Sequence, residues 1–170
     1  MPTPAHRIHD WIQIQDLYAT YIHAVDDHDW SLLGEEVFTP ETLFDWSASG
    51  GPRLKWSEIR ATPYGGFPMA EWFPYGFHVC TNLVIDFMEG SAANEEARVK
   101  SKTIHPSGLP EKGGGDAFFQ VQGVYKDVVV KTESGWRFKE RRWEDGFVMG
   151  VFTKFEGMPE MMKAAGKSIQ

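Results

Sequence analysis

Apolar side chains near the start of the chain recur at the spacing of an amphipathic helix. The recurring positions are Trp11, Ile14, Tyr18, Ile22 and Val25. Because an α-helix completes a turn about every 3.6 residues, steps of three and four keep these side chains on one face. The spacing predicts a helix over residues 8–25. Asp29 is of a residue type that often caps the N-terminus of a helix. A short second helix, WSLLGEEVF, is therefore predicted after it, ending near residues 39–40.

The rest of the chain has the composition of β-strands. A short strand is predicted at ETLFDWSAS, and longer ones at FHVCTNLVIDF, ARVKSKTIH, DAFFQVQGVYKDVVVK and WRFKERRWEDGF. Residues 56–76 contain three prolines and three glycines, which predict short helical turns and loop. Whether residues 64–76 form a lid over a cavity stays open. Helices followed by antiparallel strands predict an α+β domain with the helices packed on one face of the sheet.

Length and composition favour one folded domain over residues 1–170, with a core over about 8–147 and a C-terminal tail over 148–170. The formal net charge of −7 argues against nucleic acid and anionic membranes as partners, since both require clustered Lys and Arg. Cys80 is the single cysteine, so an internal disulfide is excluded and a reducing compartment is favoured. No run of eighteen apolar residues occurs, and we expect a cytoplasmic protein.

Asp26 is the first polar residue that points to chemistry. It lies four residues after Ile22, so on a continued helix its carboxylate would face the core. A buried carboxylate is costly unless it has a partner. The alternative is that Asp26 caps the helix end or turns outward with Asp27 and Asp29.

His78 is the leading partner for this carboxylate. Strict alternation along FHVCTNLVIDF places His78, Cys80, Asn82 and Val84 on one face and the more apolar residues, from Phe77 to Phe87, on the other. A histidine oriented by a carboxylate is a general base that works near neutral pH. A core histidine bonded to a backbone carbonyl is the alternative. His105 ends the neighbouring predicted strand, where it can equally be a loop-edge residue.

No motif for a cofactor or metal is present. His9, His23 and His28 lack the spacing of metal ligands, and the glycines at 50–51 and 113–115 lack the context of a phosphate or dinucleotide loop. We therefore expect acid–base chemistry without a cofactor or metal, on a small-molecule substrate.

The order of these segments resembles the SnoaL-like branch of the nuclear transport factor 2-like, or cystatin-like cone, superfamily. IQDLYATYIHAVDDHDW followed by FTPETLFDW is similar in layout to the scytalone dehydratase group, and HVCTNLVIDF resembles the equivalent strand of hexachlorocyclohexane dehydrochlorinase. ESGWRF resembles the last hairpin turn of the branch, so that the similarity spans about residues 8–147. The resemblance implies a cone with the N-terminal helices in the concave face of a curved, mostly antiparallel sheet.

The resemblance also implies roles for individual residues. Asp26 and His78 match a catalytic dyad, His105 matches a second histidine of scytalone dehydratase, and Tyr21 matches a tyrosine of bile-acid dehydratases. The residues expected around the substrate are Tyr18, Trp46, Phe67, Trp72, Tyr125 and Trp143. The two tyrosines that position water in scytalone dehydratase are replaced by Val25 and Trp46, which argues against scytalone itself as substrate.

The sequence is compatible with three functions. The first is a dehydratase-type lyase, and the second is an isomerase or polyketide cyclase with the same dyad. The third is a non-catalytic module for binding or dimerisation. Apolar residues on the predicted sheet leave apolar surface to be covered, which predicts a homo-oligomer, either a dimer or a trimer. These residues are Phe118, Val124, Val128 and Val130.

Overall fold

The structure is a computed structural model. It describes residues 5–49, 52–63, 65–67, 75–88, 95–109 and 117–150. Trp72, most of the segment 64–76 and the end of the tail, 151–170, lie outside the described residues, so the predictions made for them stay predictions.

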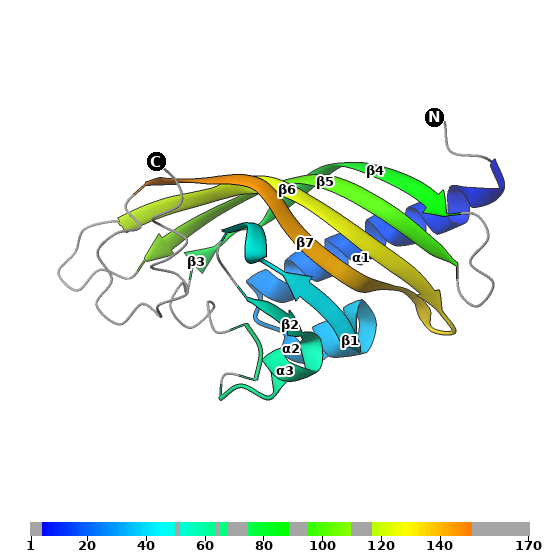
Figure 1. Ribbon diagram of the computed structural model, residues 1–170, viewed down its shortest axis with the longest axis horizontal. Coiled ribbons are helices and arrows are strands. Elements are labelled where there is room, and N and C mark those ends of the chain that lie inside the picture. The colour runs from blue at the N-terminus through cyan, green and yellow to red at the C-terminus, as the bar shows by residue number, and fades with distance from the viewer. Residues whose placement is uncertain are drawn as a thin grey trace.

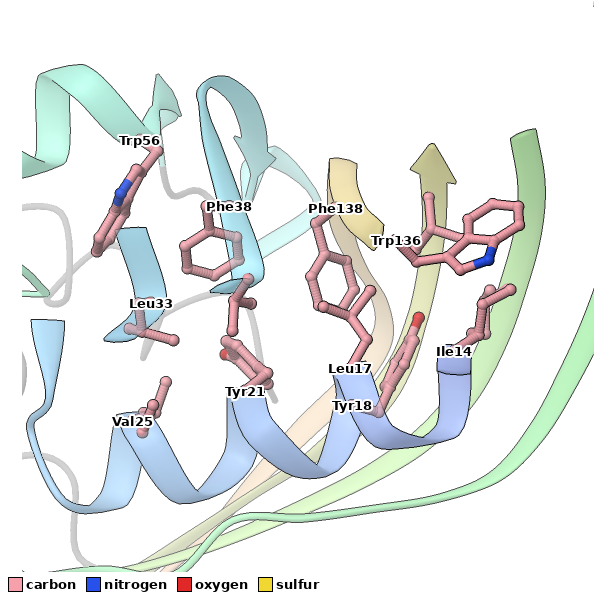
Figure 2. Close-up of a cluster of buried hydrophobic side chains, with 14 of the residues drawn as sticks. Ile14, Leu17, Tyr18, Tyr21, Val25, Leu33, Phe38, Trp56, Trp136 and Phe138 are labelled. Atoms are coloured by element: carbon pink, nitrogen blue, oxygen red, sulfur yellow. The ribbon is translucent and has the colours of Figure 1, made fainter. Parts of the chain in front are cut away.

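Helix α1, Ile8–Asp26, confirms the predicted first helix. Its buried side chains, among them Ile14, Leu17, Tyr18, Tyr21 and Val25, point toward rings of the sheet such as Phe38 and Phe138 (Figure 2). Trp11 is 37% exposed although the spacing predicted it on the buried face; it lies in the first turns of the helix, toward its N-terminal end.

The N-terminal end of α1 is tied to the sheet by charge. Asp10, only 5% exposed, accepts a hydrogen bond from the indole of Trp136 at 3.1 Å and pairs with Arg7 at 3.0 Å and Lys131 at 2.8 Å. Each interaction favours the carboxylate form, and together they lower the pKa of Asp10 in spite of its burial. A buried charge with three such partners fixes where the helix begins.

Asp29 caps the second helix as predicted, accepting a hydrogen bond from the backbone N–H of Leu32 at 2.9 Å. Helix α2, Trp30–Leu32, continues into a π-helical turn, Leu33–Val37. Strand β1, Phe38–Asp45, begins directly after this turn, so residues 39–40 lie in a strand and not at a helix end. The remaining short helices are η1 at Ala5–Arg7, η3 at Ser47–Ser49 and α3 at Trp56–Arg60.

The described strands form one sheet. They are β1, β2 (Arg53–Lys55), β3 (Tyr75–Gly76), β4 (Val79–Met88), β5 (Glu96–Leu109), β6 (Ala117–Thr132) and β7 (Gly135–Gly150). Their order is β2-β1-β7-β6-β5-β3, with β4 also pairing with β5. Only the β1–β7 pair is parallel among these strands. The sheet curves over α1, which confirms the α+β cone arrangement (Figure 1).

Strand β4 corrects the predicted alternation. The β4–β5 register shifts between Thr81 and Val84, and Asn82 takes a φ of 56°, which marks a bulge. The extra residue reverses the phase, so Cys80, before the bulge, packs against the same core as Leu83 and Ile85, after it. The predicted core face is confirmed after the bulge, at Leu83, Ile85 and Phe87, and is wrong before it, where Phe77 is 65% exposed.

Strand β5 runs beyond its predicted end at His105. Pro106 pairs with Gln120 and Leu109 with Ala117, in a region that the Gly and Pro content predicted as loop. Strand β3 pairs with this extension, through Tyr75 and Gly108. In the described ranges, no helix is long and apolar enough to cross a membrane.

Candidate functional site

Asp26 and His78 are in direct contact. The Asp26 carboxylate accepts a hydrogen bond from the His78 backbone N–H at 2.9 Å through Oδ2, and Oδ1 lies against the ring Nδ1. A carboxylate accepts only, so the ring proton lies on Nδ1 and Nε2 keeps its lone pair. The side chains are 18% and 20% exposed, respectively. Asp26 is the last residue of α1, and the helix directs its side chain toward His78.

His105 lies beside this pair, with its ring 4.1 Å from that of His78 between centroids. Its Nε2 contacts the hydroxyl of Thr103, which is buried. Burial, His78 and the positive charge of Arg141 lower the pKa of His105 well below its usual value. The second imidazole is therefore neutral near pH 7.

Arg141 of β7 is the largest fully buried side chain of the described part, with 1% of its surface exposed. Its guanidinium packs against the ring of Tyr125 at 3.8 Å and that of Tyr21 at 4.0 Å. The Tyr125 ring also faces His105, at 6.1 Å. The negative faces of the aromatic rings stabilise the charge of a desolvated guanidinium. Tyr125 lies between this guanidinium and His105.

Asp127 of β6 is the nearest anion to this arginine, with Oδ2 3.4 Å from Nη1 of Arg141. The hydroxyl of Tyr18 donates to the same oxygen at 2.5 Å. Burial raises the pKa of Asp127 to about 6, although Arg141 and Tyr18 act in the opposite direction. Tyr18, Asp127 and Arg141 thus form a polar cluster within the core between α1 and the sheet.

Three of the six other predicted residues that the structure describes, Trp46, Phe67 and Trp143, have contacts outside the histidine pair. Phe67 packs against Trp46 at 6.1 Å and against Phe44 at 5.3 Å, in an aromatic cluster of β1 and the α3 region. Trp143 is 8% exposed and lies against Gly123. The structure therefore brings together Asp26, His78, His105, Tyr21, Tyr18 and Tyr125.

The sequence reasoning missed Arg141 and Asp127. Arg141 stands next to Arg142 in a short basic pair, which by itself gives no sign of a buried site. The sequence does contain a signal for Asp127. It alternates with Tyr125 and Val129 at the two-residue period of a strand, which predicts that all three side chains lie on the inner face of the sheet. The same kind of argument pointed to Asp26. Among the described residues, no group of three or more His, Cys, Asp or Glu could hold a metal ion.

Comparison with known proteins identifies the family. The model of the SnoaL-like domain matches residues 6–142, and the chain belongs to this family. No curated protein matches.

Solved structures share the fold at low identity. A Novosphingobium aromaticivorans protein given the provisional name scytalone dehydratase is 18% identical, with a TM-score of 0.64 over 87% of this chain and 91% of that one. A hexachlorocyclohexane dehydrochlorinase from Novosphingobium barchaimii is also 18% identical, with a TM-score of 0.65 over 90% and 97%. A nuclear transport factor 2-like superfamily protein from Salmonella enterica is 20% identical, with a TM-score of 0.59 over 88% and 96%. These similarities establish the cone fold.

Proposed function

We propose that this protein is a cofactor-independent lyase of the dehydratase type that acts on a small hydroxylated cyclic or polyketide-like compound. The observation that carries the proposal is the double contact between the Asp26 carboxylate and His78, through backbone N–H and ring Nδ1. This contact leaves Nε2 as a base. Solved relatives named for a dehydratase and a dehydrochlorinase, both eliminating enzymes by name, share the fold.

In the proposed reaction, Nε2 of His78 removes a proton from the carbon next to a carbonyl. The electron pair of the broken C–H bond moves onto the carbonyl oxygen and gives an enolate, while Asp26 stabilises the imidazolium. When the enolate collapses, the C–O bond to the hydroxyl group breaks. The leaving oxygen takes the proton from the imidazolium and departs as water, so atoms and charge balance and His78 returns to its neutral state.

His105 has a narrower role than a proton donor. Because its pKa is well below the usual value, the charged form is scarce near pH 7. We propose that its neutral ring, held by Thr103, positions the substrate beside His78. Tyr21 and Tyr125 keep their hydroxyl protons, because burial raises the pKa of both phenols, and they can donate to a developing enolate oxygen.

The same dyad also supports an isomerase or cyclase, in which the enolate is reprotonated on carbon or attacks an internal electrophile. Only the products distinguish these outcomes from elimination. A module that binds a ligand without chemistry remains the third alternative, and it requires that the loss of Asp26 and His78 leave ligand turnover unchanged. We also propose a cytoplasmic homo-oligomer, consistent with the acidic charge and the single cysteine.

The experiment is a turnover assay on a panel of cyclic β-hydroxyketones, with enone formation followed by absorbance and mass. Asp26→Asn and His78→Gln should each lower kcat/KM by about 10²–10⁴, the usual contribution of a general base. Asp27→Asn removes the neighbouring, exposed carboxylate and should leave turnover unchanged. If no compound loses water in a dyad-dependent way, the lyase proposal is wrong.

A further inference from the structure

Four buried polar atoms of the Arg141–Asp127 pair lack hydrogen-bond partners in the described chain. They are Nε, Nη1 and Nη2 of Arg141 and Oδ1 of Asp127. The pair is nevertheless close, since Oδ2 of Asp127 is 3.4 Å from Nη1. The backbone N–H of Arg142 and the thiol of Cys80 also act on this pair, but neither makes a hydrogen bond of normal geometry to the four atoms.

This arrangement is expensive for a purely structural pair. A buried donor or acceptor without a partner costs free energy, and a buried ion pair contributes to stability only when its remaining protons and lone pairs are satisfied. The rings of Tyr21 and Tyr125 stabilise the charge of the guanidinium, but they lie against it and do not accept its in-plane N–H groups. The unused capacity therefore points to a ligand.

The chemistry of the free atoms defines what that ligand presents. Arginine only donates hydrogen bonds, and an ionised carboxylate only accepts them. A ligand that satisfies both residues presents an oxygen acceptor to Arg141 and, next to it, an O–H donor to Asp127. A carbonyl with a hydroxyl on the adjacent carbon or on the next one has this pattern, whereas a hydrocarbon or a halogenated ring offers no donor for Asp127.

We propose that Arg141 and Asp127 form a substrate subsite for a hydroxy-carbonyl group, with the carbonyl oxygen at Arg141 and the hydroxyl at Oδ1 of Asp127. The inference rests on the proposed function, since it names the substrate class of the same site. Tyr125 contacts both Arg141 and His105, so a carbonyl held by the arginine lies one ring away from the histidines. A positive charge at the carbonyl oxygen would also stabilise the enolate that His78 generates.

The test uses binding and not turnover. Isothermal titration calorimetry near neutral pH compares three probes of one size class: acetophenone with a carbonyl only, α-methylbenzyl alcohol with a hydroxyl only, and α-hydroxyacetophenone with both. The last probe should bind the wild-type protein about tenfold tighter than either of the others, because one hydrogen bond to a charged group is worth roughly that factor. This comparison needs no variant, so a folding defect cannot obscure it.

Variants then assign the preference to the two residues. Asp127→Asn should remove the advantage of the hydroxylated ketone over acetophenone, and Arg141→Lys should weaken binding of both ketones because the planar fork is lost. Asp45→Asn is the matched control: Asp45 is also a buried carboxylate on the sheet, 6% exposed and paired with Arg53 at 3.1 Å, but its loss should leave the preference intact. Equal affinity for all three probes, or no binding of any probe, would overturn the proposal.

The same titrations in His78→Gln separate this subsite from the proposed function. If the preference for the hydroxy-carbonyl probe persists there while no dyad-dependent elimination is found, the subsite stands and the lyase assignment fails. If elimination depends on the dyad but the probes bind equally, the lyase stands and the subsite is wrong.

Discussion

Asp127 shows how the fold sets the charge of one residue. The carboxyl group is 2% exposed, and burial disfavours its ionised form, while Arg141 and the hydroxyl of Tyr18 favour it. The result is a pKa of about 6, above the usual value, so the group titrates just below neutral pH. Asp10 is also little exposed, but it lies near the end of α1, less deeply in the protein, and its close partners Arg7 and Lys131 lower its pKa. The depth of burial and the partners together decide the sign.

We predict that recognition of a hydroxyl group depends on this titration. Above about pH 6 Asp127 is ionised and accepts the hydroxyl of α-hydroxyacetophenone, and as the pH falls through that value the carboxyl gains a proton and the preference over acetophenone declines. The groups that act on Asp127 are Tyr18 and Tyr21 of α1, Arg141, Glu140 and the backbone N–H of Arg142 on β7, Tyr125 of β6 and Cys80 of β4. The pKa values of Tyr18, Tyr125, Cys80 and Arg141 are raised, so these four keep their charge state across neutral and mildly acidic pH.

The measurement is the ratio of the two dissociation constants in the wild-type protein as a function of pH. The pKa of His105 is lowered well below its usual value by burial, so this ring is neutral at the upper end of the range. A ratio that does not change between about pH 8 and about pH 5 would show that the Asp127 carboxylate does not contact the hydroxyl.

Among the elements, strands β6 and β7 pair with a bulge between them. Their register shifts between Gln122 and Val124, and Asp145 has a φ of 48°. Gly123 lies within this shift, and a Cβ added there would stand 2.3 Å from Nε1 of Trp143 and 3.2 Å from the backbone oxygen of Glu144. The missing side chain lets the indole lie against the strand, two residues from Tyr125.

We predict that Gly123→Ala destabilises the protein by about 1–3 kcal/mol, the usual cost of overpacking, and lowers Tm by several degrees. Thermal unfolding followed by circular dichroism measures this shift. Gly34→Ala is the control, because the nearest heavy atom to its Cβ would be Nε1 of Trp56 at 3.5 Å, an ordinary contact. If both variants melt at the wild-type temperature, Trp143 is not held by Gly123.

The whole molecule has a sheet with two different faces. The inner face packs on α1, while the outer face carries exposed apolar side chains: Val84 is 65% exposed, and the directly paired Val79 and Ile104 are 36% and 39% exposed. These residues extend the apolar surface that the sequence indicated on β6. Exposed apolar side chains on an open sheet face favour association with another chain.

We predict that the wild-type protein is a homo-oligomer and that Val84→Lys shifts it toward the monomer, since a buried unpaired charge would oppose association. Sedimentation velocity over a range of concentrations measures the change. Ile12→Lys adds the same charge at a residue of α1 that is 47% exposed and should leave the oligomer intact. A monomeric wild-type protein at all concentrations would contradict the prediction.

Local patterns were sufficient where one period or one cap decides the structure. The helix over 8–25, the Asp29 cap and the order of helices before strands follow from spacing and turn chemistry alone, and the structure confirms them. Along FHVCTNLVIDF the predicted phase failed only before Asn82, because a one-residue bulge there reverses the phase of a strand and no local sequence signal indicates it. The strand beyond His105 was missed for a related reason, since pairing with β6 overrides the loop preference of Pro106 and its neighbours.

The sequence by itself determined the class of fold, and it indicated an inward phase for Asp26 and a histidine that could meet it. Only the tertiary structure decided that His105 stands beside His78, and that Arg141 lies against Tyr21 and Tyr125 with Asp127 as its anion. The physical reason is that periodicity fixes which face of an element a residue occupies, whereas the pairing register of distant strands and their curvature over α1 fix which faces meet. Burial and charge pairing, and with them the protonation of His105 and Asp127, exist only after those faces have met.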